Sequence, residues 1–124
     1  MEITILLEYS DRSQLREWLQ DNHSKEKECW VIISRSETPP AGVLPYIDVV
    51  EEALCFGWID STLKKLPDGR LAQRLSPRRK NSHWTELNKH RCEALISNGL
   101  MTDAGLKAFE SSIQKPLYTH PLNR

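Results

Sequence analysis

Residues 55–88 read CFGWIDSTLKKLPDGRLAQRLSPRRKNSHWTELN, and this stretch decides the fold around it. Two strand-like segments, 58–66 and 70–76, flank Pro67-Asp68-Gly69. A three-residue loop with glycine in the left-handed position is a common hairpin turn, so we predict a β-hairpin over residues 58–76. This loop length gathers four apolar side chains on one face, which a two-residue turn would scatter over both: Ile59, Leu63, Leu71 and Leu75.

The same register predicts the residues of the opposite face of the hairpin. Thr62 would pair with Arg74, and Asp60 with Ser76. Asp60 and Arg74 would then be diagonal neighbours within reach of an ion pair. The predicted second face carries Trp58, Asp60, Thr62, Lys64, Ala72, Arg74 and Ser76.

Further strands and helices are predicted along the rest of the chain. Apolar residues alternate over residues 2–8, and CWVII at 29–33 is a continuous apolar run typical of a central strand. Asp11 can cap a helix over 11–22, with Gln14 three residues on as the second residue of a capping box. Helical spacing between capping residues and glycine or proline predicts three more helices: from Pro45 to Gly57, from Ser82 or His83 to Gly99, and from Thr102 to Pro116. The expected class is α+β: a small antiparallel sheet of three or four strands with about four helices packed mainly on one face.

Size and charge restrict the class of protein further. The 124 residues suit one domain, here residues 1–115, followed by a tail at 116–124. Lys+Arg and Asp+Glu balance at 17 each, which argues against a generalised nucleic-acid or membrane coat. No apolar run suits a membrane span, and the N-terminus has no signal-peptide pattern. Three cysteines in apolar contexts predict a reduced, cytoplasmic protein with buried thiols.

The basic junction after the hairpin is the first candidate site. Arg74, Arg78 and Arg79 precede Ser82, where a helix could begin. Helix N-termini present free backbone N–H groups and a partial positive charge, and neighbouring arginines bind phosphate or carboxylate. The alternative interpretation is a solvated basic turn with Ser82 as an ordinary helix cap.

Aromatic residues beside an acid form the second candidate site. Large aromatic rings next to polar groups can line a ligand pocket, here Trp58, Asp60, Trp84 and Asn88. The alternative places both tryptophans in the core, with Asp60 as a structural partner of Arg74 or of backbone N–H groups. The combined ligand-binding set is Trp58, Asp60, Arg74, Arg78, Arg79, Ser82, Trp84 and Asn88.

Metal and covalent chemistry receive no support from the sequence. His83 and His90 lie seven residues apart, too far to share one small ion without other ligands. No histidine is placed in sequence to activate Cys55 or Ser61, so no nucleophile is predicted. We predict neither a metal nor a cofactor, and the one alternative catalytic group is Asp60 as a general acid or base.

The segments ALCFGWIDS, RLSPRRKNSHWTELN and NGLMTDAG resemble the YdeI/OmpD-associated family, also called bacteriocin-protection proteins. The resemblance covers most of residues 10–110 and the first-half region of that family. It implies a bacterial or archaeal protein linked to envelope stress and peptide-antibiotic resistance, and it carries over no catalytic residues. Typical members continue into a C-terminal segment rich in Arg and Lys that this sequence does not show. The shared pattern includes Gly57, Trp58, Ile59, Asp60, Arg74, Pro77, Arg78, Arg79, Ser82, Trp84 and Asn88.

The leading hypothesis from the sequence is a small cytoplasmic binding module for an anion, either a small molecule or a nucleic-acid phosphate. In this hypothesis the arginines supply charge, the helix start supplies donors, Trp84 forms an apolar wall and Asp60 orients Arg74. Two alternatives stay open: an enzyme that uses Asp60, and a protein-interaction module with an exposed tryptophan patch. The sequence leaves the oligomeric state open.

Overall fold

The computed structural model describes residues 2–79 and 82–114, so the predicted tail at 116–124 lies outside the described residues. This part of the chain forms an α+β fold of four helices and a five-stranded sheet, which confirms the predicted class. The elements in chain order are β1 (Leu6–Leu7), α1 (Arg12–Asn22), β2 (Cys29–Ser34), β3 (Leu44–Pro45), α2 (Tyr46–Cys55), β4 (Trp58–Lys65), β5 (Leu71–Pro77), α3 (Glu86–Ser97) and α4 (Asp103–Gln114).

Strand β2 is the centre of the sheet. One edge of β2 pairs antiparallel with β5, and β4 pairs antiparallel with β5 in turn. The short strands β1 and β3 pair parallel with β2 at its two ends. The sheet is therefore mixed and has five strands, whereas we expected three or four antiparallel ones. The alternation at residues 2–8 yields only two residues of paired strand.

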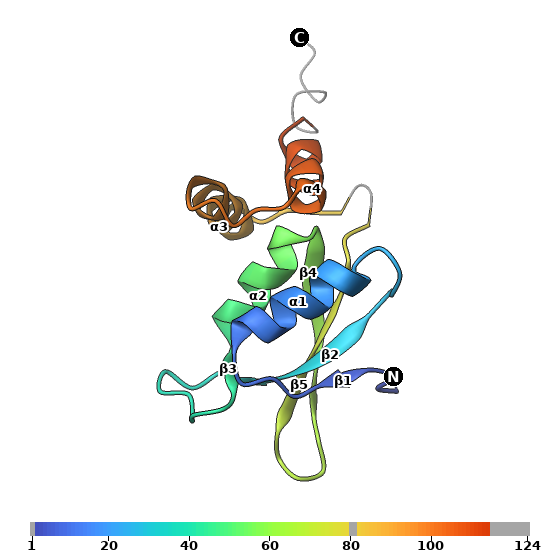
Figure 1. The fold of residues 1–124 in the computed structure, drawn as a ribbon, viewed down its shortest axis with the longest axis vertical. Helices are drawn as coiled ribbons and strands as arrows, with labels where there is room; N and C mark the ends of the chain where they lie inside the picture. Colours follow the sequence, from blue (N-terminus) through green and yellow to red (C-terminus); the bar gives the residue numbers. More distant parts are fainter. Residues whose placement is uncertain (1, 80–81, 115–124) are drawn as a thin grey trace.

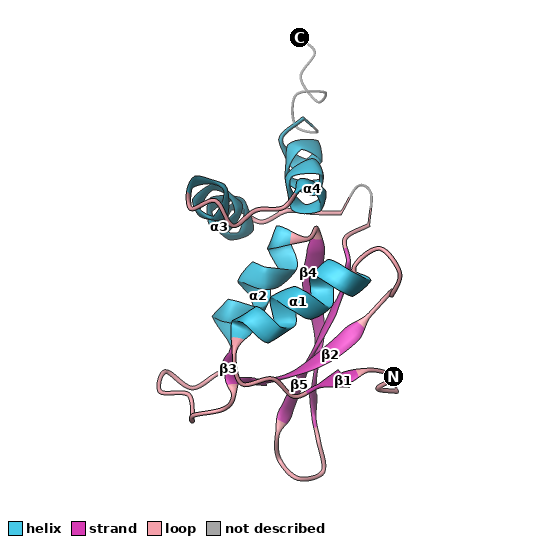
Figure 2. Ribbon diagram, viewed as in Figure 1, coloured by secondary structure: helices cyan, strands magenta, loops and turns pink. Residues whose placement is uncertain are grey.

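The main core lies between the sheet and the helices. Helices α1 and α2 cross one face of the sheet, while α3 and α4 pack beside α2 at the end where β4 begins (Figures 1 and 2). Cys29, Val31 and Ile33 of β2 face this core, and Trp30 and Ile32 face a smaller cluster on the other side. Burial on both sides explains why β2 is a continuous apolar run.

Local signals place most helix ends correctly. Asp11 and Gln14 form the predicted capping box at the start of α1, and Gly57 has a φ of +76° after α2. The predicted start of α3 at Ser82 or His83 is wrong. Thr85 is the N-cap, because its hydroxyl accepts the Asn88 N–H at 3.1 Å and the helix begins one residue later.

The hairpin turn is confirmed, but its register changes along the strands. Gly69 has a φ of +94°, and the Leu66 N–H donates to the Arg70 carbonyl at 2.8 Å. A β-bulge between Asp60 and Leu63 then shifts the pairing by one residue, so that Asp60 pairs with Leu75. One extra residue moves the side chains beyond it to the opposite face. The predicted second face is therefore wrong for Trp58 and Asp60, which lie on the helix-covered side.

Candidate functional site

Asp60 lies half-buried on the helix-covered side of β4, where it meets the first residue of α2. The Tyr46 hydroxyl donates to Asp60 Oδ2 at 2.6 Å. Burial raises the pKa of Tyr46, and the bond to the Asp60 carboxylate raises it further. Tyr46 therefore stays protonated as a donor, and Asp60 Oδ1 has no hydrogen bond among the described residues.

Arg78 lies just after β5 and stacks on Trp84. Its backbone N–H donates to the Gly57 carbonyl at 3.0 Å, and its Nη2 donates to the His83 carbonyl at 2.8 Å. The Arg78 Cζ lies 3.7 Å from the centroid of the Trp84 ring, within range of a cation–π contact. The Nε and Nη1 atoms of Arg78 are buried, and neither has a hydrogen-bond partner in the described part of the chain.

The electrostatics of Arg78 reflect a cation that is only partly compensated. Burial lowers the pKa of Arg78, and the charge of Asp60 acts in the opposite direction. Cys92 is also near Arg78, but burial raises the pKa of the Cys92 thiol to about 12. That thiol is neutral near pH 7, so it is neither a counter-ion for Arg78 nor an activated nucleophile.

Two more arginines lie near the Tyr46–Asp60 pair. Arg91 of α3 donates from Nη1 to the Asn88 Oδ1 at 3.0 Å, and the Cζ of Arg35 lies 4.3 Å from the Tyr46 ring centroid. Both positive charges oppose the rise in the pKa of Tyr46, as expected for cations near its hydroxyl.

Among the described residues, three arginines near the Tyr46–Asp60 pair therefore carry positive charge without a carboxylate partner. Within residues 2–79 and 82–114, no carboxylate forms an ion pair with Arg35, Arg78 or Arg91. We call the group of residues that surrounds this charge the Arg78 site: Arg35, Tyr46, Asp60, Arg78, Trp84, Asn88 and Arg91.

Arg74 is not part of the Arg78 site, so the predicted Asp60–Arg74 pair is wrong. The bulge in β4 leaves Arg74 on the other face of the sheet, where its Nε binds Glu28 at 2.6 Å and its Nη1 binds the Ser61 hydroxyl at 3.2 Å. The bond from Arg74 lowers the pKa of Glu28. Arg74 is thus a paired structural residue rather than a free ligand-binding cation.

Trp58 is also wrong as a ligand wall. Its side chain is 1% exposed and packs edge-on against Trp18, with ring centroids 6.0 Å apart. The core interpretation therefore holds for Trp58, and an interaction patch that includes it is excluded. Trp84 is half-buried, packs against Phe109 with centroids 6.0 Å apart, and carries Arg78 on its face.

Arg79 and Ser82 lie in the turn between β5 and α3. Arg79 is exposed, and its carbonyl accepts the Ser82 N–H at 3.0 Å. Because α3 begins at Glu86, Ser82 does not bring the N–H groups of a helix start to the arginines. Of the eight predicted residues, those that the structure brings together are Asp60, Arg78, Trp84 and Asn88.

Sequence reasoning missed three residues of the Arg78 site. Tyr46 has the spacing of the apolar face of α2, so the sequence pattern alone assigns it to the core, although a buried tyrosine hydroxyl usually has a partner. Arg91 follows Asn88 by one helical turn, so helical spacing could have found it. Arg35 lies in the loop after β2, and no sequence pattern links it to Tyr46.

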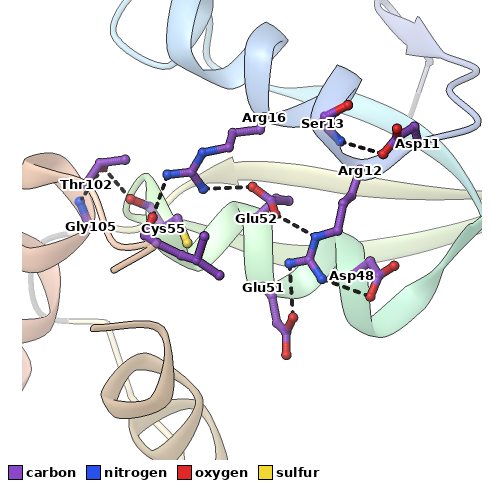
Figure 3. A network of polar contacts seen from close by, with 11 residues as sticks. Asp11, Arg12, Ser13, Arg16, Asp48, Glu51, Glu52, Cys55, Thr102 and Gly105 are labelled. Atoms are coloured by element: carbon purple, nitrogen blue, oxygen red, sulfur yellow. Dashed lines mark hydrogen bonds and ion pairs between the residues drawn. The ribbon is translucent and has the colours of Figure 1, made fainter. Parts of the chain in front are cut away.

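A second polar cluster joins α1 to α2 and contrasts with the Arg78 site (Figure 3). Arg12 binds Asp48 at 3.1 Å, Glu51 at 3.0 Å and Glu52 at 2.8 Å. Arg16 binds the other carboxylate oxygen of Glu52 at 3.0 Å and the Leu100 carbonyl. The Glu52 side chain is 4% exposed, so both arginines compensate a buried charge. We call these residues the α1–α2 network.

The described residues contain neither a cluster of metal ligands nor a helix that could span a membrane. No group of three or more His, Cys, Asp or Glu side chains could hold a metal ion there. The helices in residues 2–79 and 82–114 are all too short or too polar to cross a membrane.

The fold and the Arg78 site define a small α+β protein with an arginine-rich, partly buried polar site. A family model described as a domain of unknown function (DUF8412) matches residues 7–108, so the chain belongs to that family. Neither the curated proteins nor the solved structures gave a match. The resemblance to the YdeI/OmpD-associated family stays a prediction.

Proposed function

We propose that this protein binds a small anionic ligand at the Arg78 site. The observation that supports the proposal is the pair of buried nitrogens of Arg78, Nε and Nη1, which have no partner among the described residues. Buried polar groups are nearly always hydrogen-bonded, and leaving one without a partner costs about 1–3 kcal/mol. An oxyanion would supply both the missing acceptors and the missing charge.

The surrounding residues favour a compact ligand. Trp84 covers one face of the Arg78 guanidinium, and Arg91 and Arg35 add positive charge without a carboxylate partner in the described residues. The balanced charge of the whole chain offers little for a long phosphate backbone. A small phosphate or carboxylate compound is the favoured ligand, and a nucleic-acid phosphate is the alternative.

Thermal unfolding tests this proposal with a matched pair of variants. Arg78→Lys keeps the charge but loses the planar set of donors, whereas Arg79→Ala removes an exposed charge from the adjacent residue. The panel contains inorganic phosphate, phosphorylated metabolites, carboxylates, nucleotides, and short DNA and RNA. A ligand that binds only the folded state raises Tm.

We expect at least one member of the panel to raise the Tm of the wild type and of Arg79→Ala, and to raise that of Arg78→Lys much less. An equal rise in all three proteins, or no rise with any compound, would contradict the proposal. Binding that weakens steeply with salt would favour a nucleic acid, and weak salt dependence would favour a small ligand.

An enzyme that uses Asp60 as a general acid or base is the second candidate function. The half-buried Asp60 carboxylate accepts the bond from Tyr46, and its charge acts on Arg78, which could hold an anionic substrate. Asp60→Asn should then abolish turnover of a bound compound and preserve its binding. Unchanged turnover in Asp60→Asn would exclude this role.

We place either function in the cytoplasm, because Cys29, Cys55 and Cys92 are free and buried as expected in a reducing compartment. A role in envelope stress or peptide-antibiotic resistance rests on the resemblance alone. No observation on the described surface favours a protein partner over a small ligand.

A further inference from the structure

Resting on that proposed function, we propose that the ligand is a small zwitterion, with an oxyanion group that binds Arg78 and a protonated amine that binds Asp60. An amino acid and an amino-alkyl phosphate share this chemistry. Asp60 and Arg78 lie in one region, because the Arg78 N–H donates to the carbonyl of Gly57, three residues before Asp60, and the charge of Asp60 acts on Arg78. In the described part of the chain, neither Asp60 nor the guanidinium groups of the Arg78 site form an ion pair with one another.

Elsewhere in the described chain, opposite charges in semi-buried positions pair directly. Arg12 and Arg16 hold Glu52 at 2.8 and 3.0 Å. Arg74 holds Glu28 at 2.6 Å. Asp60 and Arg78 form no such pair, although the charge of Asp60 acts on Arg78, and this difference sets the Arg78 site apart.

The hydrogen bond from Tyr46 does not neutralise Asp60. A neutral tyrosine supplies a donor to Oδ2 and leaves the negative charge of the carboxylate in place. Oδ1 is not among the buried atoms without a partner, and Asp60 as a whole is half-buried. This oxygen can therefore accept a hydrogen bond from a ligand that approaches from solvent.

A ligand with a single charge could pair with either the Asp60 carboxylate or the Arg78 guanidinium, but not with both. A simple anion on Arg78 would come near the Asp60 carboxylate and be repelled by it. A simple amine on Asp60 would leave the buried nitrogens of Arg78 without an acceptor. A zwitterion pairs both groups at once, so we expect it to bind at least about tenfold more tightly than the same molecule without its amine.

Isothermal titration calorimetry with matched probes tests this inference. Alanine is compared with propionate, and O-phosphoethanolamine with ethyl phosphate, so each pair differs by one ammonium group. The two pairs distinguish a carboxylate from a phosphate as the oxyanion. The expected result is a preference of about tenfold or more for the zwitterion in at least one pair.

The Asp60→Asn variant should abolish this preference, because an asparagine oxygen can still accept the Tyr46 bond but carries no charge. The amine-free probe should bind this variant as tightly as the wild type or more tightly. Asp68→Asn, in the exposed hairpin turn, is the control, and it should leave the affinities of all four probes unchanged.

The outcomes separate this inference from the proposed function. Equal binding of both members of each pair, unaffected by Asp60→Asn and lost in Arg78→Lys, would overturn the zwitterion and keep the anion site. A preference that persists in Asp60→Asn would also overturn it. If no probe binds while another anion of the larger panel does, the zwitterion is wrong, and if nothing binds at all, both proposals are wrong.

Discussion

The α1–α2 network and the Arg78 site both hold arginines in semi-buried positions, but among the described residues only the network supplies them with carboxylate partners. In the network, Arg12 and Arg16 reach carboxylate oxygens at 2.8–3.1 Å. In the Arg78 site, the guanidinium of Arg78 reaches one carbonyl and one aromatic ring, and two of its nitrogens lack partners among the described residues.

Under the proposed function, this difference separates a charge that stabilises the fold from a charge that is kept for binding a ligand. An arginine paired with a buried carboxylate becomes costly to remove, since its loss leaves that carboxylate uncompensated. An arginine without a carboxylate partner leaves no buried acid uncompensated when it is removed, so its loss should cost less, and binding sites commonly reduce stability for the sake of function. Variants in the α1–α2 network and variants in the Arg78 site can each test this contrast.

The largest expected effect is the loss of the buried acid of the α1–α2 network. Glu52→Ala leaves Arg12 and Arg16 without their shared carboxylate and should lower the free energy of unfolding by about 3 kcal/mol. Urea unfolding measures this change. The matched control is Glu51→Ala, whose partly exposed pair with Arg12 should cost less than about 1 kcal/mol. Equal losses in the two variants would show that burial of Glu52 is not the decisive factor.

The next effect concerns the thiol near Arg78. Burial raises the pKa of Cys92 from its ordinary value of 9.0 to about 12, despite the positive charge of Arg78. A thiol with a raised folded-state pKa contributes stability that is complete below pH 9 and is lost as the pH rises towards 12. At pH 10.5 this loss should be about 2 kcal/mol per cysteine.

Comparing unfolding free energies at pH 8 and pH 10.5 checks this expectation. Cys92→Ala should reduce the difference between the two pH values by about 2 kcal/mol, and Cys29→Ala should do the same, since its pKa is also raised to about 12. If Cys92→Ala leaves the difference unchanged, Arg78 compensates the thiolate after all, and the Arg78 site would resemble the α1–α2 network.

The smallest effect belongs to the pair of Arg74 and Glu28 on the far face of the sheet. The Arg74 bond holds the pKa of Glu28 below its ordinary value of 4.5. The pair therefore stabilises the fold above about pH 4.5, and this contribution is lost as the pH falls through the lower folded-state pKa.

Glu28→Gln should cost less than about 1 kcal/mol at pH 7 and still less at pH 3, measured by urea unfolding at both pH values. The response to ligands of the Arg78 site should stay the same in this variant. A lost ligand response would return Arg74 to the ligand-binding set and add Glu28 to it.

The sequence was informative where short-range signals act. The capping box of Asp11 and Gln14, the apolar run of β2 and the left-handed Gly69 each depend on neighbours in the chain, and all three were predicted correctly. The start of α3 was missed because Ser82, His83 and Thr85 offer similar local choices, and packing of the whole chain decides among them.

The bulge in β4 explains why the sequence pattern misplaced Trp58, Asp60 and Arg74. Residues 60–63 contain no glycine or proline that would signal it. The bulge changes contacts between residues that are distant in the sequence. Trp58 packs in the core, Asp60 accepts a hydrogen bond from Tyr46, and Arg74 forms an ion pair with Glu28. The structure nevertheless places Asp60, Arg78, Trp84 and Asn88 in one region, and three of these four residues follow one another closely in the chain.

The most direct test of the contrast is the stability of two matched variants, Arg16→Met and Arg78→Met. Methionine keeps much of the apolar stem and removes the charge in both. Arg16→Met removes an ion pair of Glu52 and the bond to the Leu100 carbonyl, and should lower the free energy of unfolding by about 2 kcal/mol. Arg78→Met should change it by less than about 1 kcal/mol, or increase it. A loss in Arg78→Met as large as that in Arg16→Met would show that Arg78 is a structural residue and would contradict the account.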